Sequence, residues 1–395
     1  MEHFSIVLAL ARSAMEHPSS ALTNHIKRLI KALENEGESE QAKSFRKLIE
    51  KNVQSIQIKP SRVILSSAIG GELLTPSVKA PVDKETSASL AEIVHPIENH
   101  CVPPVFEQDL LSSIESLLEE WSSVDKLKLN GIEPALSLML FGEPGTGKTL
   151  LAHHISKTLG YPLIIAKLDG LLSSFLGTTA RNIANLFAFA NRYKCILLLD
   201  EFDAIAKLRD DPNELGELKR VVNTLLQCLD ERNKIGFTIA ITNHESLLDP
   251  AIWRRFDIRI NVPKPGVLAR ETIISSHFND AIKITDVQLE FLVWLTKGYS
   301  GSDIEKLANF LKRKVALLED KFEFLPTISE YVRLSAKPSD LDSKREKFIG
   351  SPEELMIILS NDNELKMSQA RLAKLFGKTQ STISRWSQKD KLIGG

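Results

Sequence analysis

The stretch "SLMLFGEPGTGKTLLAHHISKTLG", Ser137–Gly160, decides the fold of this chain of 395 residues. A short apolar run comes first, a glycine-rich turn follows, and a segment with helical spacing of its apolar residues ends the stretch. The turn, Gly142 to Thr149, has the spacing G-x-x-x-x-G-K-[ST] between a strand and a helix, the context that a phosphate-binding loop requires. We therefore predict an α/β fold organised around a nucleoside triphosphate.

The residue types in this loop suit phosphate binding. Glycines at three positions allow backbone N–H groups to curl around phosphate oxygens, beside the positive end of the following helix. Lys148 is expected to reach the outer phosphates of ATP, and the hydroxyl of Thr149 to ligate Mg²⁺. A glycine-rich turn without a ligand is the competing interpretation. The predicted nucleotide-binding residues of the loop are Gly142, Glu143, Pro144, Gly145, Thr146, Gly147, Lys148, Thr149 and Leu150.

Short apolar runs alternate with helical segments around this loop, between residues 103 and 265. The runs are "SLMLF", "PLIIAKL", "CILLLD", "GFTIAIT" and "IRINV". Continuous apolar strands separated by helices are typical of a parallel sheet that is buried on both faces. The sequence thus predicts a parallel sheet flanked by helices, with residues 103–265 as the large ATPase domain.

The segments before and after this domain have different compositions. Residues 1–60 show three amphipathic helical patterns and predict a helical bundle, and the Ser-, Gly- and Pro-rich residues 61–102 predict a linker that docks in places. Residues 266–338 are helical throughout and predict a lid. The last domain, residues 339–395, opens with Ser351 as an N-cap and Glu354 as its capping-box partner.

Composition limits the kinds of binding partner and the cellular compartment that we expect for this chain. The 50 Lys and Arg residues balance 51 Asp and Glu residues, so the whole chain has no charge bias toward nucleic acid or membranes. Cys101, Cys195 and Cys228 are odd in number and lack ligand spacing, which favours free thiols in a reducing compartment. No stretch approaches the roughly 20 apolar residues that cross a bilayer. We expect a cytoplasmic protein without membrane contact.

A second motif, "CILLLDEFD", ends a predicted buried strand in acids. Because ligands bind at the carboxyl ends of parallel strands, Asp200 is expected beside the phosphate loop, as the carboxylate that supports Mg²⁺. Glu201 follows and is placed to polarise a water for in-line attack on the terminal phosphate. Acids after a strand also serve as helix N-caps, which is the alternative for this pair.

From about residue 131 to 316 the chain resembles the AAA+ ATPases, and within them the AAA subgroup of protein unfoldases and remodellers. In "IAITN", Asn243 resembles the family's sensor residue, which the resemblance places near the terminal phosphate. "LDPAIWRRFD" resembles the segment that carries arginine fingers, so Arg254 and Arg255 are implied to reach a neighbouring subunit's site. Members commonly separate the two arginines, whereas here they are adjacent, and this leaves open which one is the finger. Surface solubility or a local carboxylate pair is the alternative.

The stretch "GYSGSDIEKL", Gly298 to Leu307, resembles the part of the family's lid that lies near the base and ribose, and it adds Gly301 to the predicted nucleotide set. The second-sensor arginine of other AAA+ branches is not apparent here, which favours the AAA subgroup. An arginine supplied by a neighbour implies that the site is complete only between subunits. The resemblance therefore implies a homo-oligomeric ring, most often a hexamer.

Phe175, Leu176 and Gly177 resemble the aromatic, hydrophobic, glycine pore loop with which AAA unfoldases grip a polypeptide substrate. An aromatic side chain on a glycine-hinged loop can contact many sequences through apolar packing and move with the nucleotide state. The alternative is that Phe175 is a core residue at the start of the next helix. The stretch "RDDPNELGELKR", residues 209–220, is a weaker candidate for a second pore loop, and a solvated turn explains it nearly as well.

The C-terminal "SQARLAKLFGKTQSTISRWSQKDKLI", residues 368–393, resembles a helix-turn-helix with its turn at Gly377. From Leu365 onward the chain has seven basic residues and one acidic residue, and this local excess of positive charge favours contacts with phosphates. DNA is the expected ligand, although such units also bind proteins, and Trp386 is expected in the small core. The predicted DNA-contacting residues are Gln380, Ser381, Thr382 and Arg385.

Two functions remain open on this evidence. The first is an ATP-driven remodeller or unfoldase that takes substrates through a ring pore. The second is a DNA-directed regulator whose ATP state controls assembly on DNA. Within the first, compact bacterial AAA ATPases with a similar "RRFD" resemble the partner of a subtilisin-like protease in anti-phage defence. The chain has no G-x-S-x-G or H-E-x-x-H motif of its own, so proteolysis would come from a partner protease, reached directly or through an adaptor.

Overall fold

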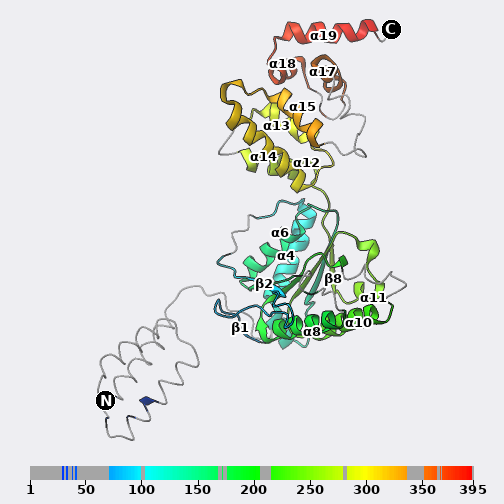
Figure 1. Cartoon of the computed structure of the whole chain (residues 1–395). Helices are drawn as coiled ribbons and strands as arrows, with labels where there is room; N and C mark the ends of the chain where they lie inside the picture. The colour runs from blue at the N-terminus through cyan, green and yellow to red at the C-terminus, as the bar shows by residue number, and fades with distance from the viewer. Residues whose placement is uncertain are drawn as a thin grey trace. The chain divides into compact units, whose positions relative to one another are not determined.

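The structure is a computed structural model (Figure 1). It describes residues 29, 30, 33, 38, 41, 71–98, 103–167, 171, 176–204, 215–278, 283–335, 351–362, 365 and 367–393. The chain divides into two units, Met1–Ile64 and Leu65–Gly395. Most of the predicted N-terminal bundle lies outside the described residues. Within its second predicted helix, Ile30 and Leu33 are helical and buried.

A six-stranded sheet forms the centre of the second unit, in the order β2-β4-β6-β7-β3-β8. All pairings are parallel except that of β2 with β4, which is antiparallel. Each of the five predicted strands is present, which confirms the expected fold class. The strand bounds are β2 Ala91–Val94, β3 Ser137–Phe141, β4 Leu163–Ala166, β6 Ile196–Leu199, β7 Thr238–Thr242 and β8 Ile258–Asn261.

Helices cover both faces of this sheet, and the side chains of each strand alternate between two apolar cores. Along β3, Met139 belongs to the core under α8 and α10, whereas Leu138 and Leu140 belong to the core under α4 and α6. This double burial explains the near-continuous apolar strands of the sequence. The elements are α4 Gln108–Ser122, α5 Val124–Leu129, α6 Lys148–Leu159, α8 Leu176–Arg192, α10 Leu215–Arg232, η1 Glu245–Leu247 and α11 Pro250–Trp253.

The structure differs from the sequence-based expectation over residues 71–98, which were predicted to belong to a linker. This segment supplies β1 (Glu72–Leu73), paired with β5 (Tyr193–Lys194), and the edge strand β2. Leu74, Leu90 and Ala91 are buried in the core under α8 and α10. The segment's many Ser, Pro and charged residues hid these few apolar contacts, and its strands are too short to show a period.

The remaining described elements are helices, as the sequence predicted for the lid. Ser351 and Glu354 form the expected capping box, in which the Ser351 hydroxyl accepts from the Glu354 N–H at 3.3 Å and the Glu354 carboxylate accepts from the Ser351 N–H at 3.1 Å. The bounds are α12 Val267–Phe278, α13 Asp286–Leu295, α14 Gly301–Leu318, η2 Glu319–Lys321, α15 Phe324–Ser335, α17 Pro352–Asn361, α18 Gln369–Phe376 and α19 Gln380–Ile393.

Two of the three cysteines are described, and both are free thiols. Cys195 is buried, and burial raises the pKa of the half-buried Cys228 to about 11, so both are neutral near pH 7. Cys101 lies outside the described residues. Across the described part of the chain, no helix combines the length and the apolar character needed to span a membrane.

Candidate nucleotide site

The strand order brings three predicted motifs to one edge of the sheet. β7 lies between β6 and β3, and all three run in parallel, so their carboxyl ends are neighbours. The phosphate loop follows β3, Asp200 follows β6 and Asn243 follows β7. Residues separated by up to about a hundred positions in the chain therefore face one cavity, which follows from the topology of parallel sheets.

The phosphate loop has the backbone that its glycines predict. Gly142, Gly145 and Gly147 have φ values of 139°, 76° and 97°, in the region that residues with a Cβ rarely adopt. Gly147 is the N-cap of α6, so the first N–H groups of this helix open toward the cavity. The loop thus presents backbone donors and a positive helix end to the same space.

Lys148 is held inside the loop. Its side chain is 4% exposed, and its ammonium donates to the carbonyl oxygens of Gly142 at 2.8 Å and Glu143 at 2.7 Å. Burial lowers the pKa of this amine from its ordinary value, although the nearby Asp200, Asp203 and Glu143 act in the opposite direction. Lys148 therefore lines the cavity with its ammonium held by two carbonyls of the loop.

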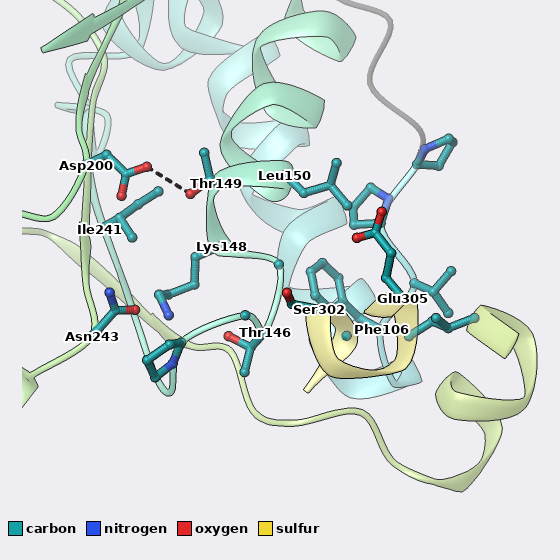
Figure 2. A pocket seen from close by; sticks show the side chains of 18 of the residues that line it. Phe106, Thr146, Lys148, Thr149, Leu150, Asp200, Ile241, Asn243, Ser302 and Glu305 are labelled. Carbon is teal, nitrogen blue, oxygen red and sulfur yellow. Dashed lines mark hydrogen bonds between the residues drawn. The ribbon is translucent and has the colours of Figure 1, made fainter. Parts of the chain in front are cut away.

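Thr149 and Asp200 meet at this edge of the sheet. The Thr149 hydroxyl donates to the Asp200 carboxylate at 2.9 Å (Figure 2). A hydroxyl and a carboxylate beside a phosphate loop are the oxygen ligands that Mg²⁺ prefers, because it keeps waters and phosphate oxygens as its remaining ligands. These two residues therefore fit the predicted magnesium ion.

Glu201 has an unusual backbone conformation. Its φ is 51°, in the left-handed region that costs a residue with a Cβ on the order of 1 kcal/mol, and its N–H donates to the Asp200 carboxylate at 2.8 Å. The next residue, Phe202, is fully buried and donates its N–H to the carbonyl of Ile241. The turn is thus fixed on both sides, and the exposed Glu201 side chain lines the cavity together with Asn243.

The cavity has a volume of about 610 Å³ and extends well beyond the predicted motifs. Its predicted lining residues are Pro144, Gly145, Thr146, Gly147, Lys148, Thr149, Leu150, Asp200, Glu201, Asn243 and Gly301. The other lining residues are Ser302 and Glu305, within the stretch Gly298–Leu307 that was expected near the base and ribose, and Pro103, Pro104, Val105, Phe106, Ile241, Ile273, Ser276 and His277, which the sequence did not reveal. They include a strand position, the segment that precedes α4 and two lid helices. Burial lowers the pKa of His277, which keeps its ring neutral near pH 7.

The lid touches the phosphate loop directly. The N–H of Ser302, in the first turn of α14, donates to the carbonyl of Gly145 at 3.1 Å. A Cβ on Gly145 would lie 2.8 Å from the Ser300 hydroxyl and 2.9 Å from the Ser302 Cβ. Gly145 is therefore required twice, for its backbone conformation and for the close approach of the lid.

Gly142 and Glu143, the two predicted loop positions that do not line the cavity, have structural partners. Glu143 forms an ion pair of 2.6 Å with Lys264, which lies between β8 and the lid helix α12. The buried Thr146 hydroxyl donates to the Glu143 carbonyl at 3.0 Å. Gly142 lies against the carbonyl of Val262, where a Cβ would be 2.5 Å away. The loop is thus packed against the segment that leads to the lid.

The adjacent residues Arg254 and Arg255 differ in the exposure and in the hydrogen-bond partners of their side chains. Arg255 donates to both oxygens of Asp230 and to the carbonyl of Ala251. Arg254 is exposed, and no hydrogen bond or ion pair joins its side chain to another described residue. Neither arginine is among the residues that line the cavity of its own chain.

The predicted pore loop is described only in part. Phe175 lies outside them, and Leu176 and Gly177 are the first residues of α8. The candidate second pore loop, residues 209–220, is described only from Leu215, where α10 begins.

The C-terminal candidate residues lie at the start of α19, after the left-handed turn at Gly377. Gln380, Ser381 and Arg385 are exposed, while Thr382 is half-buried with its hydroxyl 3.0 Å from that of Thr379. Trp386 packs against the C-terminal core, with its ring 5.9 Å from that of Phe376. The two helices and the polar start of the second one are therefore where the sequence placed them.

Comparisons with known proteins agree with this geometry. The model of the "ATPase family associated with various cellular activities (AAA)" matches residues 138–264. A Sinorhizobium fredii protein named uncharacterized AAA family ATPase y4kL is 34% identical over 266 residues, 67% of this chain and 76% of that protein. The ATP-dependent zinc metalloprotease FtsH of Aquifex aeolicus is 33% identical over 51% of this chain and 33% of its own length. Proteasome-activating nucleotidase 2 of Haloferax volcanii is 34% identical over 58% of each chain. This chain thus spans less than two thirds of the latter two relatives.

Proposed function

The chain belongs to the AAA family of ATPases and is itself an ATPase, and from that premise we propose that it is a ring-forming protein remodeller that hydrolyses ATP at the cavity of about 610 Å³. The observation that carries the proposal is the contrast between the exposed Arg254 and a nucleotide cavity that no described arginine of the same chain lines. Such a site gains its missing positive charge from a neighbouring subunit. Hydrolysis is then coupled to assembly.

Each residue of the cavity edge has a part in this mechanism. The backbone donors of the loop and the ammonium of Lys148 bind the phosphates in place of the loop carbonyls. Thr149 and Asp200 would hold Mg²⁺, which would supply positive charge that stabilises the charge developing on the phosphates. Glu201 orients a water and accepts its proton as the oxygen attacks the terminal phosphorus. Asn243 hydrogen-bonds that water or the terminal phosphate.

Arg254 is the arginine finger in this proposal, and Arg255 positions it. An arginine that reaches a neighbour must be free of partners in its own subunit, and Arg254 meets this condition among the described residues. Arg255 is held by Asp230, and its backbone carbonyl accepts from Ser137 at 3.1 Å and from Asn233 at 2.6 Å. These contacts fix the turn on which Arg254 is presented. The finger stabilises the charge of the transition state.

The substrate in this proposal is a polypeptide threaded through the pore of a hexamer. Two of the similar proteins are named for proteolytic systems, a zinc metalloprotease and a proteasome-activating nucleotidase. In this chain Leu176 and Gly177 begin α8, which packs on the core of the ATPase unit. Phe175 would grip the substrate and move with that helix. A separate protease, as in phage defence, is the partner that would degrade the unfolded product in the cytoplasm.

The experiment that tests this function compares steady-state ATPase rates of the wild type and Phe175→Ala, with an unfolded polypeptide or duplex DNA added separately. Leu129→Ala is the matched control, because Leu129 is 87% exposed and lies outside the cavity lining. Stimulation by polypeptide that is lost only in Phe175→Ala supports the remodeller. A rate that no polypeptide changes, or a stimulation indifferent to Phe175, rejects it.

A second candidate function is favoured by the described C-terminal helices. Gln380, Ser381 and Arg385 lie exposed at the start of α19, where a helix-turn-helix contacts the major groove. In this candidate the chain is an ATPase regulator that assembles on DNA. Stimulation of the ATPase rate by duplex DNA alone, equal in the wild type and Phe175→Ala, is the result that would replace the remodeller with the regulator.

A further inference from the structure

The three C-terminal helices pack on the lid. Buried apolar residues of these helices and of the lid belong to one hydrophobic core, and α17 and α18 lie beside the lid helices in Figure 1. Met356 and Leu359 on α17 and Ile383 on α19 have no exposed surface, and α18 packs against the lid helix α13. Because a buried apolar core resists shear and transmits displacement, α17–α19 are expected to move with the lid.

An ion pair reinforces the boundary between these helices and the lid. Nη2 of Arg371 on α18 lies 2.5 Å from Oε2 of Glu290 on α13, and this carboxylate oxygen is buried. The Arg371 and Glu290 side chains are 46% and 34% exposed, so the pair is partly solvated, and its short distance constrains the spacing of α18 and α13. The pair therefore holds α18 on the lid in a defined position.

The opposite end of the lid belongs to the nucleotide cavity. Side chains of α12 and α14, including Ile273, His277 and Glu305, line the cavity, and Ser302 donates to the phosphate loop. A nucleotide in this cavity thus contacts the same body of packed helices that carries α19 at its other side. Movement of the lid relative to the phosphate loop therefore changes the shape of the nucleotide cavity and the position of α19 together.

The exposed face of α18 and α19 fits a polyanion. Lys374, Lys378 and Arg385 are exposed, and the described residues 367–388 contain no acidic side chain. Arg371 is committed to Glu290 and does not add to this face. Donors of the Gln and Ser type at the start of α19 accompany the cations, a combination that suits base edges and phosphates together. Duplex DNA is the partner that this surface fits.

We propose that α17–α19 form a DNA-responsive extension of the lid, so that duplex DNA bound on α19 changes the affinity of the cavity for nucleotide. This inference rests on the second candidate function, because it needs DNA as the ligand of α19. The coupling must be reciprocal, so nucleotide changes the DNA affinity by the same factor. The chain is then an ATPase whose nucleotide state is set by DNA through the lid.

The test uses the full chain and two ligands, a fluorescent ADP analogue and a mixed-sequence duplex of thirty base pairs at fixed salt. We expect duplex to change the nucleotide Kd by about 5-fold or more, and nucleotide to change the duplex Kd by the same factor. Lys378→Glu with Arg385→Glu should abolish duplex binding and the shift, with the nucleotide Kd in the absence of DNA unchanged.

A second pair of variants tests the route through the boundary. Glu290→Lys places two cations opposite each other at this boundary. We expect the variant to bind both nucleotide and duplex, but neither ligand should any longer change the Kd of the other. The charge reversal Glu290→Lys with Arg371→Glu restores the ion pair and should restore the shift, which separates loss of coupling from misfolding.

Three results overturn the inference in distinguishable ways. Duplex binding with an unchanged nucleotide Kd rejects the coupling and leaves the DNA function standing. If duplex does not bind even at low salt, both the coupling and the DNA function are rejected. Binding of an acidic polypeptide in place of duplex, through Lys378 and Arg385, assigns the surface to a protein partner and likewise overturns the proposal.

Discussion

The guanidinium of Arg255 donates two hydrogen bonds to the carboxylate of Asp230, from Nε at 3.0 Å and from Nη2 at 3.3 Å. Such paired bonds fix the orientation of both groups, so the adjacent exposed Arg254 is presented from a defined turn. The relationship separates two arginines that the sequence leaves equivalent. It also gives a direct test of their roles.

Arg254→Ala should reduce kcat by on the order of 10³-fold or more while ATP still binds, because an arginine finger acts on transition-state charge. Arg255→Ala should lower activity less, through a loosened turn. The exchange Asp230→Arg with Arg255→Asp should recover turnover to near the wild-type level, measured as steady-state phosphate release. An exchange as inactive as Arg255→Ala would instead make Arg255 a finger.

Glu201→Gln should bind ATP with wild-type affinity and lower kcat by about 10²- to 10⁴-fold, since the amide cannot accept the proton of the attacking water. Single-turnover hydrolysis and equilibrium binding of ATP measure the two effects. Glu245→Gln is the matched control, because Glu245 is an exposed carboxylate in η1 outside the cavity lining. Normal turnover in Glu201→Gln would remove the assignment of this residue.

Gly145→Ala should weaken ATP binding at least 10-fold, because its Cβ would press on Ser300 and Ser302 and displace the lid from the phosphate loop. Gly131→Ala is the control for backbone strain. Gly131 also has a positive φ, 72°, but a Cβ there meets nothing within 4 Å. We expect Gly131→Ala to cost about 1–2 kcal/mol of stability with ATP affinity unchanged. Equal losses of affinity in both variants would show that strain alone is responsible.

Asp303 should make the start of α14 sensitive to acid. Burial acts to raise the pKa of its carboxyl, but hydrogen bonds from Ser300 and the nearby Lys306 outweigh it and the net pKa is below the ordinary value of 3.8. A carboxyl whose pKa is lower in the folded state stabilises the fold at pH values above its ordinary pKa. This stabilisation is lost as the pH falls through the pKa of the folded state.

The measurement is the urea midpoint of unfolding of the wild type and Asp303→Asn at several pH values. Near pH 7 the variant should be less stable by about 1 kcal/mol, the usual worth of a helix N-cap interaction. The difference should shrink below pH 3.8, where the wild-type carboxyl also becomes neutral. A difference that is constant down to the acid limit would mean that the Asp303 charge does not contribute.

Much of the fold and of the nucleotide site follows from short stretches of sequence. The strand β3, the turn from Gly142 to Thr149 and the start of α6 are encoded by contiguous residues, because strand burial, positive φ and helix capping depend on near neighbours. The capping box of Ser351 and Glu354 was predictable for the same reason. The approach of Asp200 to Thr149 followed from the parallel order of the strands.

The sequence did not reveal contacts between residues that are distant in the chain. Nothing near Phe106 or His277 indicates that these side chains line the nucleotide cavity, since their positions depend on how α4 and the lid pack. The strand β2 was hidden in a segment with the composition of a linker, because a few buried apolar residues and an edge pairing suffice to hold it.

The sequence by itself determined the phosphate loop, the acids that follow β6, the five parallel strands and the helix pair at the C-terminus, since each depends on local spacing and conformational preference. Only the tertiary structure decided that Arg255 pairs with Asp230 while Arg254 stays exposed, and that α17–α19 share the core of the lid. Those outcomes depend on which surfaces pack together, and packing free energy is a property of distant residues brought into contact.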